Sequence, residues 1–274
     1  MGNNDIWILR FNSQGDTLWT RKYGKSYGDD AGYHLIIDQS DNIIAVGYTD
    51  NLTSPGVHDK QIWMHAVDLN GNNFWPNERS YGDDTRDEVA NSIVEVSDGY
   101  ILAGSINPKN STRNIFLLNT NKYGIVRLFR GIESNDDDQG NMITGLSDGN
   151  FMVLGTRTNV STNTSDILLT KMDASFNIIG SPKILDNGEN ESASCFIRRN
   201  NQIHILGTTT ESRTDTRKIL LIIADESGSN PEYHVYGLKN ILMEGFGMDY
   251  TSDGGYVFTG SNLVLYKTED SGEL

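Results

Sequence analysis

The chain has 274 residues, of which 37 are acidic and 22 basic, so its formal net charge at pH 7 is −15. No cluster of Lys and Arg interrupts this negative charge, and the composition therefore argues against nucleic acid and anionic lipid surfaces as partners. No apolar run approaches the ~20 residues that cross a bilayer, so no membrane span is expected. The single cysteine, Cys195, excludes an intrachain disulfide and is expected to be a small buried apolar side chain.

The same order of segments recurs five times along the chain. Each copy has an alternating polar and apolar run, a turn of the Asp-Gly or Asn type, a small-residue apolar run that ends in Gly, a polar loop and a further apolar run. This last run is the clearest marker, and its six occurrences begin at residues 6, 62, 115, 167, 219 and 264. A period of ~40–50 residues with about four short strands per unit is typical of a β-propeller.

The second complete copy shows how one unit divides into strands. We expect an inner strand A at 88–97, strand B at 100–106, strand C at 114–121 and an outer strand D at 125–131. Strand B ends in Gly in every copy, which indicates close approach of backbones, expected here between neighbouring blades. These glycines are Gly47, Gly104, Gly155, Gly207 and Gly260.

Counting strands gives five A, five B, five D and six C strands, one C strand more than five blades require. The N-terminal hairpin (6–11 with 17–23) supplies a C and a D strand, and the C-terminal segment ends in a rival C strand at 264–268. We predict a single all-β domain over residues 1–274. It is a five-bladed β-propeller of four-stranded antiparallel blades, closed by the N-terminal hairpin, and a six-bladed or incomplete propeller is the alternative.

Large aromatic side chains also recur at the repeat period. Trp7, Trp63 and Phe116 occupy equivalent places in strand C, and Trp19 and Trp75 do so in strand D. Side chains that repeat with the blade are expected to pack between blades.

Blade topology places the B–C and D–A connections on one face. The B–C connections (49–60, 106–113, 157–165 and 209–217) are expected to be long polar loops, which is where a rigid scaffold usually carries its binding residues. The D–A connections hold most of the acids, and we expect them to ring the channel mouth on this face.

The acids of the D–A connections have three interpretations. They can cap turns by accepting backbone N–H bonds. They can bind Ca²⁺, for which Asp84, Asp136 and Asp138 are the candidates, although no unit has a full D-x-D-x-D-G loop. They can act as paired glycosidase acids, for which the candidates are Asp30, Asp87 and Asp137. Because a catalytic acid is normally singular and these acids recur in each blade, the capping role is favoured.

Other catalytic signatures are absent from the sequence. It has no G-x-S-x-G elbow, no phosphate-binding G-x-x-x-x-G-K-[ST] loop and no His or Cys spacing typical of zinc. No cofactor is therefore expected, with Ca²⁺ as the one alternative.

Two stretches resemble a repeat common in secreted and lipid-anchored proteins of Bacteroidetes-type bacteria. They are DIWILRFNSQGDTLWTRKYG (5–24) and DEVANSIVEVSDGYILAG (87–104), and the resemblance covers essentially the whole chain. It implies a propeller fold and an exported protein, periplasmic, lipid-anchored or secreted, whose leader is absent from this sequence. A cytoplasmic protein is the alternative.

The sequence favours a non-enzymatic binding or scaffold propeller that recognises a glycan or a protein through the face of the long loops. The alternative is a carbohydrate-active enzyme that uses the carboxylates at the channel mouth. A third possibility is a structural module whose open blade docks to another domain or copy.

Overall fold

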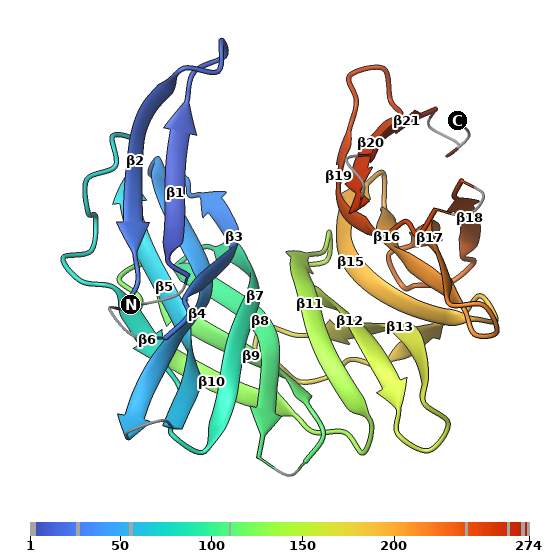
Figure 1. Cartoon of the computed structure of the whole chain (residues 1–274), viewed down its shortest axis with the longest axis horizontal. Helices are drawn as coiled ribbons and strands as arrows, with labels where there is room; N and C mark the ends of the chain where they lie inside the picture. The colour runs from blue at the N-terminus through green and yellow to red at the C-terminus, as the bar shows by residue number, and fades with distance from the viewer. Residues whose placement is uncertain are drawn as a thin grey trace. The chain divides into compact units, whose positions relative to one another are not determined.

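The computed structural model describes residues 4–25, 28–54, 57–109, 111–238, 241–261, 264–269 and 272. In this part of the chain the named elements are β-strands, and they form antiparallel sheets (Figure 1). The all-β fold class is therefore confirmed. The same residues include no helix with the length and apolar character needed to cross a bilayer.

Four sheets are complete blades whose strands follow one another from A to D. The first blade comprises β3 (Ala31–Ile37), β4 (Asn42–Ser54), β5 (Val57–Asp68) and β6 (Arg79–Tyr81). The second comprises β7 (Arg86–Val96), β8 (Gly99–Pro108), β9 (Asn114–Asn121) and β10 (Val126–Ile132). The third comprises β11 (Asp137–Gly145), β12 (Phe151–Asn159), β13 (Thr164–Met172) and β14 (Lys183–Leu185). The fourth comprises β15 (Asn190–Arg199), β16 (Gln202–Glu211), β17 (Thr216–Asp225) and β18 (Glu232–Tyr236).

The chain ends supply two smaller sheets. The N-terminal hairpin consists of β1 (Ile6–Phe11) and β2 (Thr17–Tyr23), and the last sheet consists of β19 (Gly245–Tyr250), β20 (Tyr256–Gly260) and β21 (Val264–Thr268). The predicted surplus C strand is thus present. Among the described residues β1 pairs with β2 and β21 pairs with β20, and no ladder joins the hairpin to the last sheet. Closure of the last blade by the hairpin remains a prediction.

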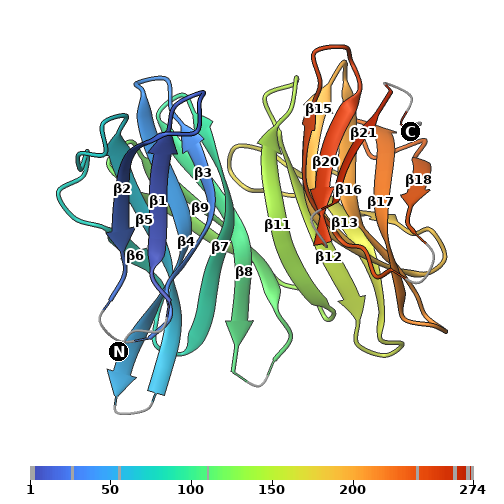
Figure 2. The same cartoon turned by 45° about the horizontal axis from the view of Figure 1, so that its top comes forward.

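Two compact units divide the chain, Met1–Ser134 and Asn135–Leu274. The single domain expected from the sequence remains a prediction. In the first unit, side chains of the first two blades form one core and the hairpin packs on the first blade through a second, smaller core. In the second unit, one core lies between the third and fourth blades and another between the fourth blade and the last sheet. Figure 2 shows the strands of these sheets.

A β-bulge interrupts strand A in each of the four complete blades and in the last sheet. The strand A residue at which the bulge begins pairs with a Gly of strand B. The reason for the Gly is the carbonyl oxygen that the bulge pushes toward strand B. A Cβ at Gly47 would lie 1.8 Å from the oxygen of Ala31, and one at Gly104 would lie 2.0 Å from that of Val89. The close approach predicted for these glycines is real, but it occurs mainly within a sheet and not between blades.

The B–C connections differ from their prediction. Most of residues 49–60 belong to a long hairpin, because β4 continues to Ser54 and β5 begins at Val57. The connections after β8, β12 and β16 are likewise short, since Thr-rich segments such as Thr208–Thr210 extend the strands. Thr is a favourable strand residue even where it is polar. The long loops expected on this face are therefore mostly strand.

One of the recurring aromatic side chains is not in the core. Trp63 and Phe116 are buried, as expected, whereas Trp7 is 60% exposed. The hairpin packs on the first blade with the face that carries Ile6 and Ile8, and Trp7 alternates to the other face of β1. The repeat thus correctly predicts that Trp7 occupies the place of Trp63 and Phe116 in its strand, but it does not predict that Trp7 is exposed.

We expect Gly104→Ala to lower the free energy of unfolding by about 1–3 kcal/mol, because its methyl group would overlap the backbone of Val89. Gly131→Ala is the matched control, since its Cβ would meet only Ile106 Cδ1 at 3.6 Å. Urea denaturation of both variants measures the difference. Equal stabilities for the two variants would contradict this account of the bulge.

Candidate functional site

An acidic residue lies two positions before the bulge of strand A in each of the four complete blades, and its side chain is buried. These acids are Asp30, Glu88, Asp138 and Glu191. In the last sheet the same position is held by the buried side chain of Met243. A carboxylate that leaves water must receive hydrogen bonds or a counter-ion, or else hold its proton.

Most of these acids are held by local donors. Asp30 accepts the backbone N–H of Lys25 at 2.7 Å and that of Asp50 at 3.3 Å. Asp138 binds the Arg157 guanidinium with both carboxylate oxygens, at 2.8 and 2.7 Å. These contacts support the architectural role that the sequence favoured for the repeated acids.

The three catalytic candidates lie at the start of inner strands or just before them. Asp30 is buried and accepts the two backbone N–H groups named above. Asp137 is half-buried at the beginning of β11 in the second unit. Asp87 accepts the N–H of Lys60 at 3.0 Å, and the residue at its place in the fourth blade, Asn190, accepts the N–H of Ser165 at 3.0 Å. Because the side-chain amide of Asn190 accepts the same kind of backbone N–H as the Asp87 carboxylate, this hydrogen bond does not require a negative charge.

The three calcium candidates are also separate in their contacts. Asp84 is exposed in the first unit, where its carbonyl oxygen lies 3.5 Å from Lys109 Nζ. In the second unit Asp136 lies 3.9 Å from the Arg157 guanidinium that already binds Asp138. A guanidinium is itself the counter-ion of this pair, so Asp136 and Asp138 are poor metal ligands as they stand.

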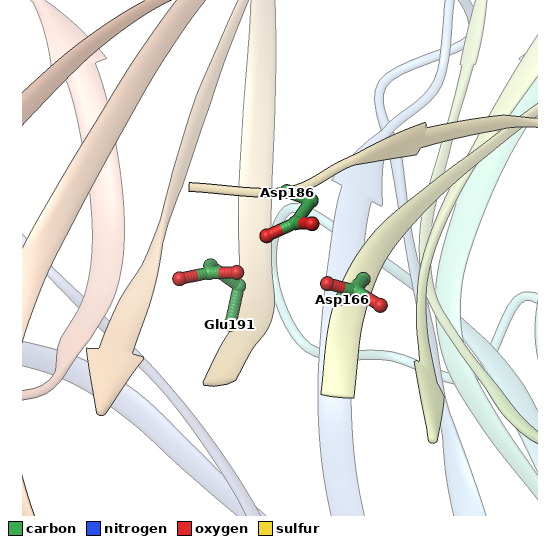
Figure 3. A group of neighbouring side chains, drawn as sticks. All are labelled: Asp166, Asp186 and Glu191. Atoms are coloured by element: carbon green, nitrogen blue, oxygen red, sulfur yellow. The ribbon is translucent and has the colours of Figure 1, made fainter. Parts of the chain in front are cut away.

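A different group of acids comes together in the second unit. One oxygen each of Asp166, Asp186 and Glu191 lies within 4.8 Å of the other two. Figure 3 shows the three carboxylates directed toward one another. Asp166 lies on β13, Asp186 follows β14, and Glu191 is near the start of β15, so the C and D strands of one blade and the A strand of the next build the group.

The strand register shows why this group is singular. The first position is the residue before the first apolar residue of strand C. The second is the residue that follows the last residue of strand D paired with strand C. The third is the residue two positions before the bulge of strand A, where the complete blades carry their buried acid. In chain order the sets are Asp5/Gly24/Asp30, Gln61/Gly82/Glu88, Asn114/Glu133/Asp138, Asp166/Asp186/Glu191 and Lys218/Gly237/Met243. All three positions are acidic in one set.

Burial separates the roles of the three acids. Glu191 is fully buried, where it accepts the hydroxyl of Thr209 at 2.9 Å and the N–H of Asn187 at 3.4 Å. Asp166 is half-buried and Asp186 is exposed. The bond to Asn187 ties Glu191 to the residue next to Asp186. Solvent and ligands therefore meet the group from the side of Asp186 and Asp166.

The electrostatics favour protonated forms within the group. Burial raises the pKa of Asp166, and the carboxylate of Asp186 raises it further. Burial also raises the pKa of Glu191, against the lowering effect of its hydrogen bonds from Thr209 and Asn187. Two acids with raised pKa beside an exposed carboxylate can both donate and accept a proton.

Sequence reasoning missed this group because its members are far apart along the chain. A signal was nevertheless present: Tyr-Gly ends strand D in three units, and Leu185-Asp186 replaces it here. An acid in place of a recurring Gly is a departure from the repeat, and such departures mark singular sites better than the repeated acids do.

Cys195 is half-buried and not fully buried as expected, and it packs against the core between the fourth blade and the last sheet. Burial raises the pKa of its thiol to about 11, so the thiolate is scarce at neutral pH.

No protein-family model and no curated protein matches the chain. Among solved structures it resembles an endo-arabinase from Bacteroides thetaiotaomicron, with a TM-score of 0.54 and 10% identity over 89% of this chain and 95% of that one. It also resembles a GH43 β-1,3-galactosidase, with a TM-score of 0.55 and 8% identity over 92% of this chain and 55% of that one. For an α-L-arabinofuranosidase from Clostridium thermocellum the TM-score is 0.50 and the identity 11%, over 87% and 92% of the two chains.

At these identities the likeness shows the fold, which is the five-bladed β-propeller of GH43 glycoside hydrolases. The five-bladed prediction is thereby confirmed. The favoured expectation of a non-enzymatic binding or scaffold propeller is wrong, because the similar structures named above are glycoside hydrolases and so favour the alternative given with it.

We expect Asp186→Asn to lower the pKa of Asp166 and of Glu191, because it removes a like charge from both. A carboxyl group whose pKa is raised by folding lowers the free energy of unfolding as the pH rises from its ordinary value, 3.8 for Asp, through its value in the folded protein. The variant should therefore lose less of this free energy over the same pH range than the parent. Carboxyl NMR titration and urea denaturation at several pH values measure both effects.

Asp148→Asn is the control for this experiment, since Asp148 is exposed and pairs with Lys171 outside the group. It should leave the Asp166 titration unchanged. An Asp166 titration that is the same in the parent and in Asp186→Asn would contradict the arrangement in Figure 3.

Proposed function

We propose that this propeller hydrolyses glycosidic bonds and that the acid group of Asp166, Asp186 and Glu191 carries the reaction. The observation behind the proposal is the gathering of three carboxyl groups at the one set of repeat positions where all are acidic. The likeness of the fold to glycoside hydrolases supports the reaction class. Hydrolysis of a glycosidic bond requires one carboxyl group that donates a proton and one carboxylate that assists the nucleophile.

The two accessible acids suit these two tasks. Asp166 is half-buried and its pKa is raised, so it is the better placed of the two to give a proton to the oxygen of the leaving sugar as the C–O bond breaks. Asp186 is exposed and lies too near Asp166 to leave room for a water between them, so its carboxylate can bond to the anomeric carbon as the C–O bond to the leaving sugar breaks. Water then displaces Asp186 from the sugar, gives one proton back to Asp166 and leaves its hydroxyl group on the anomeric carbon.

Glu191 acts as a positioning residue in this proposal. It is fully buried and so does not touch substrate, but its carboxyl group holds the N–H of Asn187 beside Asp186. Its charge also contributes to the electrostatic balance around the two accessible acids. Its removal should therefore shift the pH profile of the reaction more than substrate affinity.

The charge of the chain indicates the kind of glycan. A net charge of −15 repels uronic acid polymers, so neutral polysaccharides are the better substrates. The names of two of the similar structures, an endo-arabinase and a β-1,3-galactosidase, refer to arabinose and galactose, which are neutral sugars. Export from the cell, which the repeat resemblance implies, belongs to the same proposal, since such polymers are met outside it.

The test is release of reducing ends from arabinan, β-1,3-galactan and xylan by the purified chain. Asp166→Asn and Asp186→Asn should each lower kcat at least about 100-fold, the range that general acid and base groups contribute. Glu191→Gln should retain activity with a displaced pH optimum, and Asp148→Asn should match the parent.

Circular dichroism shows whether each variant is folded. Hydrolysis that survives in folded Asp166→Asn and Asp186→Asn would assign the activity to other residues, among them the sequence candidates Asp30, Asp87 and Asp137. Absence of hydrolysis on every neutral polysaccharide and aryl glycoside would overturn the proposed function.

A further inference from the structure

The distance between Asp166 and Asp186 bears on the stereochemistry of the proposed reaction. One oxygen of each carboxyl group lies within 4.8 Å of the other. In glycosidases that invert the anomeric centre, water fits between two carboxyl groups about 6.5–9.5 Å apart, whereas those of retaining enzymes are about 5–5.5 Å apart. The spacing of Asp166 and Asp186 therefore agrees with the shorter class.

The strand register keeps the two acids at this distance. Ile167 of β13 pairs with Leu185 of β14, and Asp166 and Asp186 are the next residues beyond this pair. Residues that face each other across an antiparallel ladder have Cβ atoms about 4.5–5.5 Å apart. Moving Asp186 far enough away to admit a water between the acids thus requires the end of this ladder to separate.

The return from β14 to β15 holds the Asp186 carboxylate in place. Asp186 Oδ1 accepts the N–H of Gly188 at 2.6 Å, and the buried Glu191 accepts the N–H of Asn187 at 3.4 Å. Gly188 has a φ of 86°, a left-handed conformation that glycine adopts without strain. Because Oδ1 is engaged by Gly188, Oδ2 is the oxygen that can bond to the anomeric carbon.

We propose that this chain retains the anomeric configuration of its substrate and transfers glycosyl groups to alcohols and sugar hydroxyls as well as to water. The inference rests on the proposed function and adds a second class of acceptor to it. In the first step the C–O bond to the leaving sugar breaks, its oxygen takes the proton of Asp166, and Asp186 Oδ2 bonds to the anomeric carbon from the opposite face.

In the second step the oxygen of an acceptor hydroxyl bonds to the anomeric carbon. The bond between that carbon and Asp186 breaks, and the hydroxyl proton returns to Asp166. Both steps displace a group from the face opposite to the one attacked, so the two together restore the original configuration.

The burial of the acids admits acceptors larger than water. Asp186 is exposed and Asp166 is half-buried, so both are reached from solvent, whereas Glu191 is fully buried. The acceptor approaches Asp166 from the side on which the leaving sugar has just departed, because the second step is the reverse of the first in geometry. A sugar hydroxyl therefore fits this position as the leaving sugar did.

The test uses the full chain with arabinan, β-1,3-galactan, xylan and the matching 4-nitrophenyl glycosides, in buffer and in buffer with methanol. Proton NMR recorded before mutarotation shows the configuration of the first sugar released. We expect the configuration of the substrate and, with methanol, a methyl glycoside of the same configuration whose amount rises with the methanol concentration. Asp148→Asn, which changes an exposed ion pair with Lys171, should give the product ratio of the parent.

Azide separates the roles of the two acids on whichever 4-nitrophenyl glycoside the parent cleaves. It attacks the anomeric carbon without a general base, so it should raise the turnover of Asp166→Asn at least about tenfold and give a glycosyl azide of retained configuration. In Asp186→Gly azide takes the place of the missing carboxylate and should give a glycosyl azide of inverted configuration. Circular dichroism shows whether each variant is folded.

The outcomes distinguish this inference from the proposed function. Release of a sugar of inverted configuration would overturn the inference and leave the proposed hydrolysis standing. A retained sugar without any methyl glycoside would do the same for glycosyl transfer, and azide products of one configuration from both folded variants would contradict the roles of Asp166 and Asp186. Cleavage of none of the substrates would overturn the proposed function, and the inference with it.

Discussion

The bulge in strand A is the constraint on which each sheet depends. It brings a carbonyl oxygen so close to strand B that the facing residue must lack a Cβ, as the distances at Gly47 and Gly104 show. A bulge increases the local twist of its strand and redirects the side chains beside it. In the four complete blades the buried acid lies two residues before the bulge. The glycine, the bulge and the acid therefore recur together in these blades.

This combination of glycine, bulge and acid explains why acidic residues are both common and mostly structural in the chain. The buried acid of strand A lies where the outer strand of the preceding blade returns to the centre, and Asp30 and Glu191 each bind a backbone N–H of that return. Chemistry then depends on two neighbouring positions that the scaffold does not fix. Where they are Asp166 and Asp186, the structural acid Glu191 becomes part of the group that we propose carries the reaction.

Much of the fold could be predicted from sequence because its signals are local. Alternating apolar residues, Asp-Gly turns and the strand B glycine recur with the blade, and they locate the strands and the surplus C strand within a few residues. The segment 49–60 was misjudged because polar residues become strand only when a partner strand pairs with them. Trp7 was misjudged because burial depends on which face of the hairpin is covered. Periodicity carries neither kind of information.

The candidate site was less predictable, and for a physical reason. Asp166, Asp186 and Glu191 meet through the register of β13 with β14 and the return to β15, which no spacing along the chain reveals. Asp30, Asp87 and Asp137 were chosen by their place at the channel mouth, yet the contacts of Asp30 and Asp87 show hydrogen bonds to backbone N–H groups. The sequence predicts where these acids lie in the blade. It does not predict which hydrogen bonds each carboxylate accepts, because the donors come from other strands.

The length of the return from strand D to strand A has an evolutionary consequence. Six residues lie between Tyr23 and Asp30 and between Tyr81 and Glu88, and there the first residue of the return is Gly24 or Gly82, with φ of 137° and 148°. Five residues lie between Leu185 and Glu191, and Asp186 keeps an ordinary φ. Deleting one residue from a surface connection thus relieves the glycine requirement beside a buried acid. An ancestral propeller could gain a reactive blade by such a deletion while its remaining blades kept their packing.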